Sequence, residues 1–582
     1  MDYREILRSL EQLHAYKTRR FVPRDVRFSC LDEVTSLYQK LLESNINSAS
    51  ELEEWLLNWS ELEAAVDQHG SILYIRMTAK TDEEKFAVEY RRFIETVLPA
   101  IKPLIDKLKN KFLQEYERFP LDSNYYEIFL RTVTADVELF VKENIELQKQ
   151  EDILSQEYQT ICGTMTVDFD GKQLTIPQMS VFLLDPDRVL REKAWRAIST
   201  RRLKDKDKLD QLFDKMVKLR HRIALNAGFD NYMEYKFKEL HRFDYTPQDC
   251  IQYHDCIEKF VLPLWKKILQ RRKETMGLDV LRPWDTSVDP LGRPPLKPFD
   301  DVKKLIDGCR IIFSMVDDEL GERFSSMAEE RLLDLENRQG KAPGGYQSTL
   351  NEARKPFIFM NAVGIDSDVW TLLHEAGHSF HSIACAHHEL LAYRHAPMEF
   401  CEVASMSMEL LGGEHISVFY PSQIDGPSEE ELRSTREQFE DIIFTLIWVA
   451  TIDAFQHWIY KNPEASIQDR KDQWLKIRQR FDTGLIDWNG LEEEHQTLWH
   501  KQLHIFEVPF YYIEYGIAQL GALQIWLNAS KNKRQAVEKY KKALSLGGSR
   551  SLPELFNEAG ICFDFSEKTI VPLVEAVADK IF

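Results

Sequence analysis

The sequence predicts a mainly α-helical protein with more than one lobe. Along most of the chain, apolar residues recur every three or four positions with charged residues between them, which is the pattern of amphipathic helices. The chain has 582 residues, of which 43% are hydrophobic, and a single hydrophobic core rarely serves a chain of that length. Two short stretches alternate apolar and polar residues instead, and strands are expected there.

Three segments show the helical pattern most clearly: residues 49–68, 82–116 and 205–228, the last ending at a helix-stopping glycine. Residues 2–21 have helical spacing without the apolar core of a signal peptide, so we expect a cytoplasmic protein. The longest apolar stretch, residues 442–452, is too short to cross a bilayer. It is expected to be a buried helix, and no membrane association is predicted.

The first strand-like stretch, residues 164–177, has Asp170 and Gly171 at its centre, a dipeptide typical of hairpin turns. It marks a weak boundary between an N-terminal helical lobe ending in a β-hairpin (1–185) and the remainder of the chain (186–582). The second stretch, residues 341–363, contains two strand-like pieces. These pieces form either a small sheet whose edge pairs with an extended peptide or a purely structural hairpin. The pattern does not distinguish between these two alternatives.

The charge balance excludes one class of partner. Acidic residues outnumber basic ones by 95 to 75, for a formal net charge of −20. Nucleic-acid binding needs a basic face to displace counterions from phosphates, so no nucleic acid is expected as a partner. The 8 cysteines form no CxxC pair and are expected to be reduced thiols. Composition does not predict the oligomeric state.

The segment TLLHEAGHSFHSIACAHH (371–388) contains the pattern His-Glu-x-x-His at His374, Glu375 and His378. Residues four apart lie on the same face of a helix, so the two imidazoles can bind one tetrahedral metal ion while Glu375 reaches a water molecule on it. The alternative is a pair of solvated histidines on an ordinary helix. The candidates for the helix N-cap are Asp366, Ser367 and Asp368.

The neighbouring histidines do not complete this site. A metzincin would have its third histidine six residues after His378, where this chain has Ala384. His381 lies about 10 Å along the helix from His374, so we expect it to pack near the site rather than bind the same ion. Three further histidines are expected in loops or on the surface: His387, His388 and His395.

A carboxylate from the next helix is the alternative third ligand. The helix is predicted to begin after Pro397 and to end at a glycine pair, residues 412–413. It offers Glu399, Glu402 and Glu409. The spacing does not indicate which of the three is the third ligand. Each of them could equally be an ordinary acid on a helix surface.

TLLHEAGHSFH followed by FCEVASMSMEL resembles the thimet oligopeptidase and oligoendopeptidase F family of zinc metallopeptidases. The resemblance extends to APGGYQSTL, PFIFMNAV, HIFEVPFYYIEYGIAQLGALQIW and LGGSRSLPELFNEAGI, and covers roughly residues 196–582. The thimet branch has a glycine-rich tyrosine segment, so this chain is closer to the oligoendopeptidase F branch. The resemblance implies a helical ellipsoid with two lobes around a deep substrate channel, zinc at its floor and a small sheet beside it.

The resemblance also implies roles for individual residues. A Phe-x-Glu segment carries the family's third zinc ligand, and the matching position is Glu402. A histidine and tyrosines that hydrogen-bond the scissile carbonyl match His504, Tyr512 and Tyr515, with Tyr511 as a second choice if the register differs. Without the resemblance, these aromatic residues would be interpreted as a core stripe.

The function implied is that of a zinc endopeptidase with one Zn²⁺ per chain, acting on internal bonds of short, unstructured peptides. Two imidazoles and a carboxylate leave a fourth position open, as in catalytic zinc sites. Glu375 is the expected general base, and Glu409 is a candidate to orient a ligand histidine. The alternatives are a zinc exopeptidase (dipeptidase or carboxypeptidase), a non-catalytic peptide-binding protein, and a helical interaction protein with a chance motif.

Overall fold

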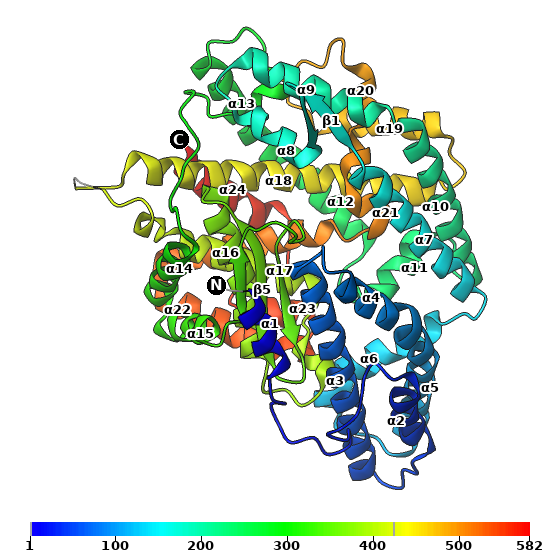
Figure 1. Ribbon diagram of the computed structural model, residues 1–582. Helices are drawn as coiled ribbons and strands as arrows, with labels where there is room; N and C mark the ends of the chain where they lie inside the picture. Colours follow the sequence, from blue (N-terminus) through cyan, green and yellow to red (C-terminus); the bar gives the residue numbers. More distant parts are fainter. Residues whose placement is uncertain (1–2, 423–424) are drawn as a thin grey trace. The chain divides into compact units, whose positions relative to one another are not determined.

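A computed structural model describes residues 3–422 and 425–582 (Figure 1). The described residues form helices with two small sheets, which confirms the predicted mainly α fold. The chain divides into two compact units, each assembled from segments distant in sequence. Unit 1 comprises Met1–Glu138, Lys297–Ser434 and Ala518–Phe563, and unit 2 comprises Leu139–Leu296, Thr435–Ile517 and Asp564–Phe582. The predicted division at residue 185 stays a prediction.

Unit 1 contains the N-terminal helices and the His-Glu-x-x-His helix. One of its apolar cores gathers residues of α2, α3, α5 and α6, among them Leu37, Trp55 and Phe112. The helices that lie wholly or mostly in this unit are α1 Tyr3–Glu11, α2 Leu31–Glu43, α3 Ala49–Ala79, α4 Glu84–Arg92, α5 Leu98–Arg118, α6 Ser123–Leu139, α14 Val302–Val316, α15 Asp318–Glu329, α16 Asp366–Ala384, α17 Met398–Gly413, α22 Ile513–Leu546 and α23 Leu552–Glu558.

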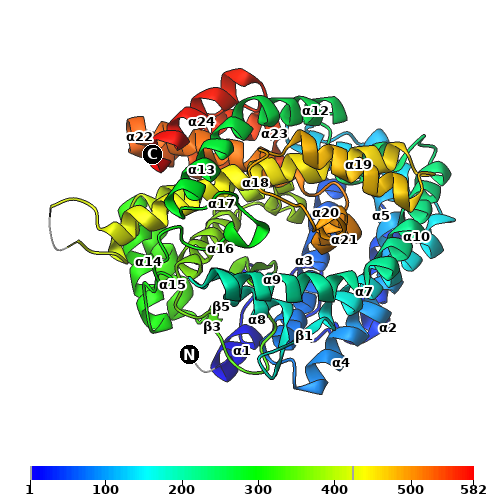
Figure 2. The same cartoon turned by 90° about the horizontal axis from the view of Figure 1, so that it is seen from above.

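Unit 2 contains the hairpin and the helices that follow it. Helices α7 and α10 lie side by side in both views (Figures 1 and 2). The helices wholly or mostly in this unit are α7 Asn144–Gly163, α8 Ile176–Ser180, α9 Arg188–Leu203, α10 Lys206–Asn226, α11 Tyr232–Glu239, α12 Pro247–Cys256, α13 Leu262–Thr275, α18 Glu429–Lys461, α19 Ile467–Arg480, α20 Glu492–Gln496, α21 Leu503–Glu507 and α24 Glu567–Ile581.

Both strand predictions are confirmed. Strands β1 Thr166–Phe169 and β2 Lys172–Thr175 form an antiparallel hairpin, and the two turn residues have the positive φ that such a turn needs. The second sheet, in unit 1, has the order β3-β5-β4, with β5 Lys355–Ala362 at its centre and β4 Tyr346–Leu350 at an edge. Strand β3 Leu333–Glu336 pairs parallel to β5 and was not predicted, because it is short and almost wholly buried rather than alternating.

Helices α16 and α17 pack against each other beside this sheet (Figure 1). A β carbon on Gly377 of α16 would lie 2.5 Å from Ser405 Cα and 2.7 Å from the Ala404 carbonyl oxygen of α17. No larger residue fits there without moving one of the helices. Gly377 precedes the second histidine of the motif, so the crossing brings α17 directly against the motif.

The start of α16 differs from the prediction in one detail. The helix begins at Asp366 with Ile365 at the N-cap, rather than with a cap among residues 366–368. Asp368 still satisfies the helix entry, because its Oδ2 accepts hydrogen bonds from the backbone N–H groups of Val363, Gly364 and Ile365 at 2.8, 2.8 and 3.0 Å. These bonds tie the end of β5 to the first turn of α16.

Helix α18 contains the apolar stretch at 442–452 as part of a helix, as predicted. Among the described residues, it is the one helix long and apolar enough to span a membrane, yet 78% of its most apolar window is buried. Buried core helices meet the same criterion of length and composition.

Candidate active site

The motif histidines and Glu402 converge in unit 1. His374 Nε2 lies 3.2 Å from His378 Nε2, and Glu402 Oε2 lies 3.5 Å from the first of these nitrogens and 3.8 Å from the second. The two histidines come from α16 and the glutamate from α17, so the close crossing of these helices creates the cluster. Of the three acids that the sequence offered, Glu402 is the one that joins both histidines.

These distances fit a tetrahedral zinc ion. Zinc–ligand bonds of ~2.0–2.2 Å imply separations between ligand atoms of roughly 3.3–3.6 Å, close to the three distances observed. Two neutral imidazoles and one carboxylate also form the donor set of catalytic zinc sites, which keep one position open. The chain therefore provides three suitably spaced ligands for one such ion.

Neighbouring groups hold these three candidate ligands in place. Glu409 Oε1 lies 2.6 Å from His374 Nδ1, which leaves Nε2 of that ring facing the cluster. His378 has a backbone hydrogen bond with Cys401, and Ser405 Oγ donates to Glu402 Oε2 at 3.3 Å. Each ligand thus has a partner that restricts its orientation.

The electrostatics of the cluster are dominated by burial and by three carboxylates. Burial lowers the pKa of His374, but Glu409, Glu402 and Glu375 together raise it to about 9. Burial, and after it the positive charge on the neighbouring His374, lowers the pKa of His378 well below its ordinary value. The excess negative charge around the pair favours a bound cation.

Glu375 lies on the same helix but faces the sheet. Its side chain is buried, and a backbone hydrogen bond from Gln347 of the edge strand β4 reaches it. Burial raises its pKa to about 7, with Glu402 adding to the effect and His374 opposing it. The motif acid and an edge strand are therefore adjacent.

The remaining acids and histidines of this region have other partners. Glu399 is buried elsewhere on α17. His381 is buried with its ring 6.0 Å from that of Phe400, so it packs near the site as predicted. His387 is exposed in a loop, whereas His388 is buried in that loop, with Nε2 3.0 Å from the Ser545 carbonyl oxygen.

A second cluster, in unit 2, contains the predicted histidine and tyrosines. The ring of His504 lies 4.8 Å from Tyr512, 5.8 Å from Tyr515 and 6.2 Å from Tyr511. All four side chains are partly exposed, unlike a stripe of core aromatics. Burial raises the pKa of Tyr512 to about 12, so its hydroxyl keeps its proton at neutral pH.

Two residues that the sequence analysis missed determine which nitrogen of His504 carries the proton. Trp448 Nε1 donates to Gln502 Oε1 at 2.9 Å, and because an indole can only donate, the Gln502 amide nitrogen must face His504. That nitrogen lies 2.7 Å from His504 Nδ1. Burial lowers the pKa of His504 to about 4, so the ring is neutral, accepts at Nδ1 and carries its proton on Nε2.

The turn before the tyrosines is also held by residues that no motif indicated. Phe510 has φ of 66°, a left-handed conformation that side chains rarely adopt. Its N–H donates to Gln456 Oε1 at 2.7 Å, and its carbonyl oxygen accepts from Arg242, which also pairs with Glu514 at 2.7 Å. Surrounding contacts therefore maintain a strained turn beside the tyrosine cluster.

Comparison with known proteins gives consistent matches. The sequence model described as Peptidase family M3 matches residues 181–571, and that described as Peptidase M3 N-terminal domain matches residues 28–140. An "Oligoendopeptidase F homolog" of Borreliella burgdorferi is 23% identical over 512 residues, which cover 84% of this chain and 78% of that protein. "Oligoendopeptidase F, plasmid" of Lactococcus lactis subsp. cremoris is 21% identical, covering 87% of this chain and 86% of that protein. The solved structure "PZ PEPTIDASE A with inhibitor 2" has a TM-score of 0.86 at 27% identity, covering 97% of this chain and 99% of the other.

Proposed function

Because the chain belongs to peptidase family M3, we propose that it hydrolyses internal peptide bonds of short, unstructured oligopeptides with one catalytic zinc ion. The resemblance to oligoendopeptidase F expected from the motifs is confirmed, and the chain is a metallo-oligopeptidase. The observation that carries the choice of metal and ligands is the set of distances, 3.2, 3.5 and 3.8 Å, that joins His374, His378 and Glu402.

A bound zinc ion would supply a Lewis acid that polarises the peptide carbonyl group and makes water acidic enough to attack near neutral pH. Glu375 removes the proton from the attacking water and later delivers it to the leaving amine. Its position next to the first ligand histidine, with its side chain buried, suits both steps. Glu409 keeps His374 oriented while these charges change.

In the second cluster, Tyr512, Tyr515 and His504 donate hydrogen bonds to the carbonyl oxygen as negative charge develops on it. The neutral histidine is suited to this role because the Gln502 amide leaves its proton on Nε2. Tyr511 stays a second choice, since its ring lies 5.4 Å from that of Tyr515 and farther from His504 than the other two.

The substrate class rests on two observations. The relatives that match most of this chain are named oligoendopeptidases. In addition, β4 is an edge strand whose Gln347 N–H reaches the motif glutamate, so an extended peptide that adds to this edge would lie beside Glu375. We propose that edge as the peptide-binding strand.

A zinc exopeptidase remains the alternative within the same chemistry. An exopeptidase must bind a charged peptide terminus, whereas an endopeptidase cleaves peptides blocked at both ends. We expect an N-acetylated, C-amidated peptide to be cut between internal residues. Products that appear solely from unblocked peptides, one terminal unit at a time, would establish the alternative.

We further propose that the protein is cytoplasmic. The 8 cysteines all lie in the described part of the chain and none is in a disulfide there, as is usual in a reducing compartment. We also propose residues 1–185 as a lobe separate from a catalytic domain at 186–582. Cell fractionation tests the location, and limited proteolysis with mass spectrometry tests the boundary.

The decisive experiment combines metal analysis with hydrolysis of an internally quenched peptide by wild type and Glu375→Gln. Wild type should cleave and carry zinc at the His374 site, and the variant should keep that zinc while losing more than about 10²-fold in turnover. A metal-free wild type that gains no activity from added zinc, cobalt or manganese would overturn the proposal. An active Glu375→Gln variant would refute the assigned role of the acid alone.

A further inference from the structure

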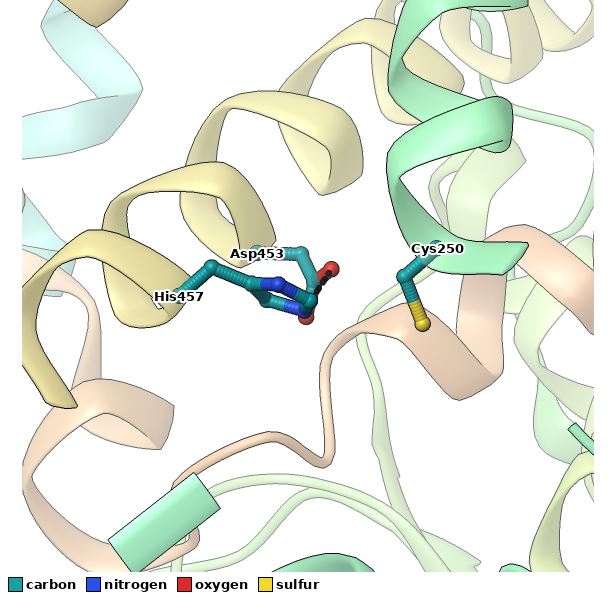
Figure 3. Close-up of side chains that lie close together, drawn as sticks. All are labelled: Cys250, Asp453 and His457. Carbon is teal, nitrogen blue, oxygen red and sulfur yellow. Dashed lines mark ion pairs between the residues drawn. The ribbon is translucent and has the colours of Figure 1, made fainter. Parts of the chain in front are cut away.

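A second group of metal-ligand side chains lies inside unit 2, apart from any residue assigned above. Cys250 comes from α12, and Asp453 and His457 come from α18 (Figure 3). One ligand atom of each lies within 4.8 Å of the other two. The three side chains are 0%, 0% and 5% exposed, so this is an interior site rather than a surface cluster.

The two helices present these side chains with the spacing that metal sites use. Asp453 and His457 are four residues apart on α18, as are Cys250 and His254 on α12. His254 Nε2 lies 2.8 Å from Asp453 Oδ2, and His457 Nε2 lies 3.2 Å from the same oxygen. Two facing helical turns therefore bring a thiol, a carboxylate and two imidazoles together.

Several of these buried atoms lack a hydrogen-bond partner among the described residues. They include Asp453 Oδ1 and His457 Nδ1. Polar atoms in protein interiors nearly always have a hydrogen-bond partner, because a buried polar atom without one loses its hydrogen bonds to water and gains no replacement. A metal ion would satisfy the carboxylate oxygen and one imidazole nitrogen at once.

Charge supports the same conclusion. Asp453 makes its ion pairs with the two histidines. A divalent ion bound by one thiolate, one carboxylate and a neutral imidazole gives a group with no net charge, which a protein interior tolerates better than a net charge.

We propose that Cys250, Asp453 and His457 bind a second divalent metal ion, with His254 positioning Asp453. The mixture of sulfur, nitrogen and oxygen ligands is characteristic of zinc, which accepts all three in a tetrahedral arrangement. These residues are buried and have no role in the proposed chemistry, so the ion would be structural, with its fourth tetrahedral position taken by a ligand other than these three side chains.

The ion would stabilise the turn that carries the tyrosines. The ring of His457 packs 5.7 Å from that of Phe510, and the preceding residue, Gln456, accepts the hydrogen bond from the Phe510 N–H group. Anchoring this part of α18 to α12 therefore fixes two contacts of a strained backbone position. Tyr511 and Tyr512 follow directly.

Cobalt substitution distinguishes this site from the catalytic one. A thiolate bound to Co²⁺ gives a strong charge-transfer band in the near ultraviolet, and the His374 cluster contains no sulfur ligand. The full-length protein is stripped with chelator, reloaded with Co²⁺ alone and scanned. We expect the band in wild type and in the double variant His374→Ala/His378→Ala, which retains one ion per chain.

Cys250→Ser should lose the band and one equivalent of metal while the protein remains folded by circular dichroism. Cys309 is another buried cysteine, outside both clusters, so Cys309→Ser is the matched control. This variant should keep the thiolate band and both equivalents of metal. If Cys250→Ser does not fold, wild type and the His374→Ala/His378→Ala variant still test the proposal, because both must show the thiolate band.

The proposal is wrong if wild-type protein shows no thiolate band, or if the His374→Ala/His378→Ala variant retains no metal under conditions where it is folded. Either result would mean that the four residues form a metal-free hydrogen-bonded cluster. The outcome is independent of the catalytic assignment, since peptide hydrolysis reports on the first site and the thiolate band on the second.

Discussion

Gly377 of α16 and Ser405 of α17 lie so close that a β carbon on the glycine would approach Ser405 Cα to 2.5 Å. This approach places Glu402, three residues before Ser405, between the two histidines of α16. The geometry of the proposed metal site thus depends on a glycine that is not one of its proposed ligands.

Gly377→Ala is therefore expected to weaken metal binding strongly. The methyl group meets backbone atoms of α17, and separating the helices costs about 1–3 kcal/mol, more than the ~1 kcal/mol that alanine gains over glycine in a helix. Gly163→Ala, where nothing lies within 4 Å of the added carbon, is the control. Zinc titration and thermal unfolding check both; a Gly377→Ala protein with unchanged zinc affinity would show that the crossing distance is not critical.

Glu409→Gln tests the hydrogen bond that orients His374. The amide is isosteric but neutral, so the 2.6 Å contact to Nδ1 weakens and the ligand becomes a poorer donor to the metal. We expect the zinc dissociation constant to rise about 10–100-fold, with activity restored by excess zinc. Glu430→Gln, an exposed acid on α18, should change neither; activity that excess zinc fails to restore would point to a role in the reaction itself.

Substitution of the tyrosines by phenylalanine separates their contributions. Removing one preorganised donor to a developing oxyanion lowers turnover by about 10²–10³. We expect this loss for Tyr512→Phe and Tyr515→Phe, with KM nearly unchanged, and little effect for Tyr511→Phe. The exposed Tyr16→Phe serves as the control. A reversed order between Tyr511 and Tyr512 would shift the assigned register by one residue.

Gln502→Glu is expected to invert the proton arrangement of His504. A carboxylate cannot donate to Nδ1, so it draws the proton onto that nitrogen and leaves Nε2 as an acceptor. The carboxylate also raises the pKa of the ring, and the protonated ring again carries a proton on Nε2. Activity relative to wild type should therefore fall on the alkaline side and recover as the pH falls.

Gln468→Glu, at an exposed position on α19, is the control for the added charge. Its activity relative to wild type should not change with pH. A Gln502→Glu variant whose pH profile parallels that of wild type would show that the His504 tautomer does not matter for turnover.

Stability should fall as the solution is acidified. Burial lowers the pKa of His69, His495 and His504 to about 4 each. An unfolded histidine titrates near ~6.5. Between these values the unfolded chain binds more protons than the folded one, so stability is complete above pH ~6.5 and declines towards pH 4, by up to about 1.4 kcal/mol per pH unit for each histidine.

Replacing His69 and His495 by glutamine should flatten this decline. His69 packs between the rings of Phe28 and Phe93, and His495 stacks on Trp488, so both titrate away from the metal cluster. Urea unfolding at pH 7.5 and pH 5 checks the effect, with the exposed His387→Gln as control. Equal slopes for the double variant and wild type would assign the acid sensitivity to other groups.

Features of this fold that depend on local interactions could be predicted from the sequence, whereas features that depend on residues far apart in the chain could not. The helix at 398–413 and the hairpin turn at Asp170 and Gly171 were predicted to within a residue, because local spacing and local φ preferences determine them. Strand β3 was missed, since its partner β5 begins about twenty residues later and nothing local marks the pairing. The N-cap at Ile365 was also missed, because Asp368 acts from inside the helix.

In the candidate site, spacing alone predicted the residues that lie on one helix. Residues four apart share a helix face, so His374 and His378 had to be neighbours, with Glu375 beside them. The choice of Glu402 over its two neighbours, the contact of Glu409 with His374 and the Trp448–Gln502–His504 chain required the folded structure. So did the meeting of Cys250 with Asp453, some two hundred positions apart. A helix dictates which of its own side chains are neighbours, whereas the distance between two helices depends on how their surfaces pack.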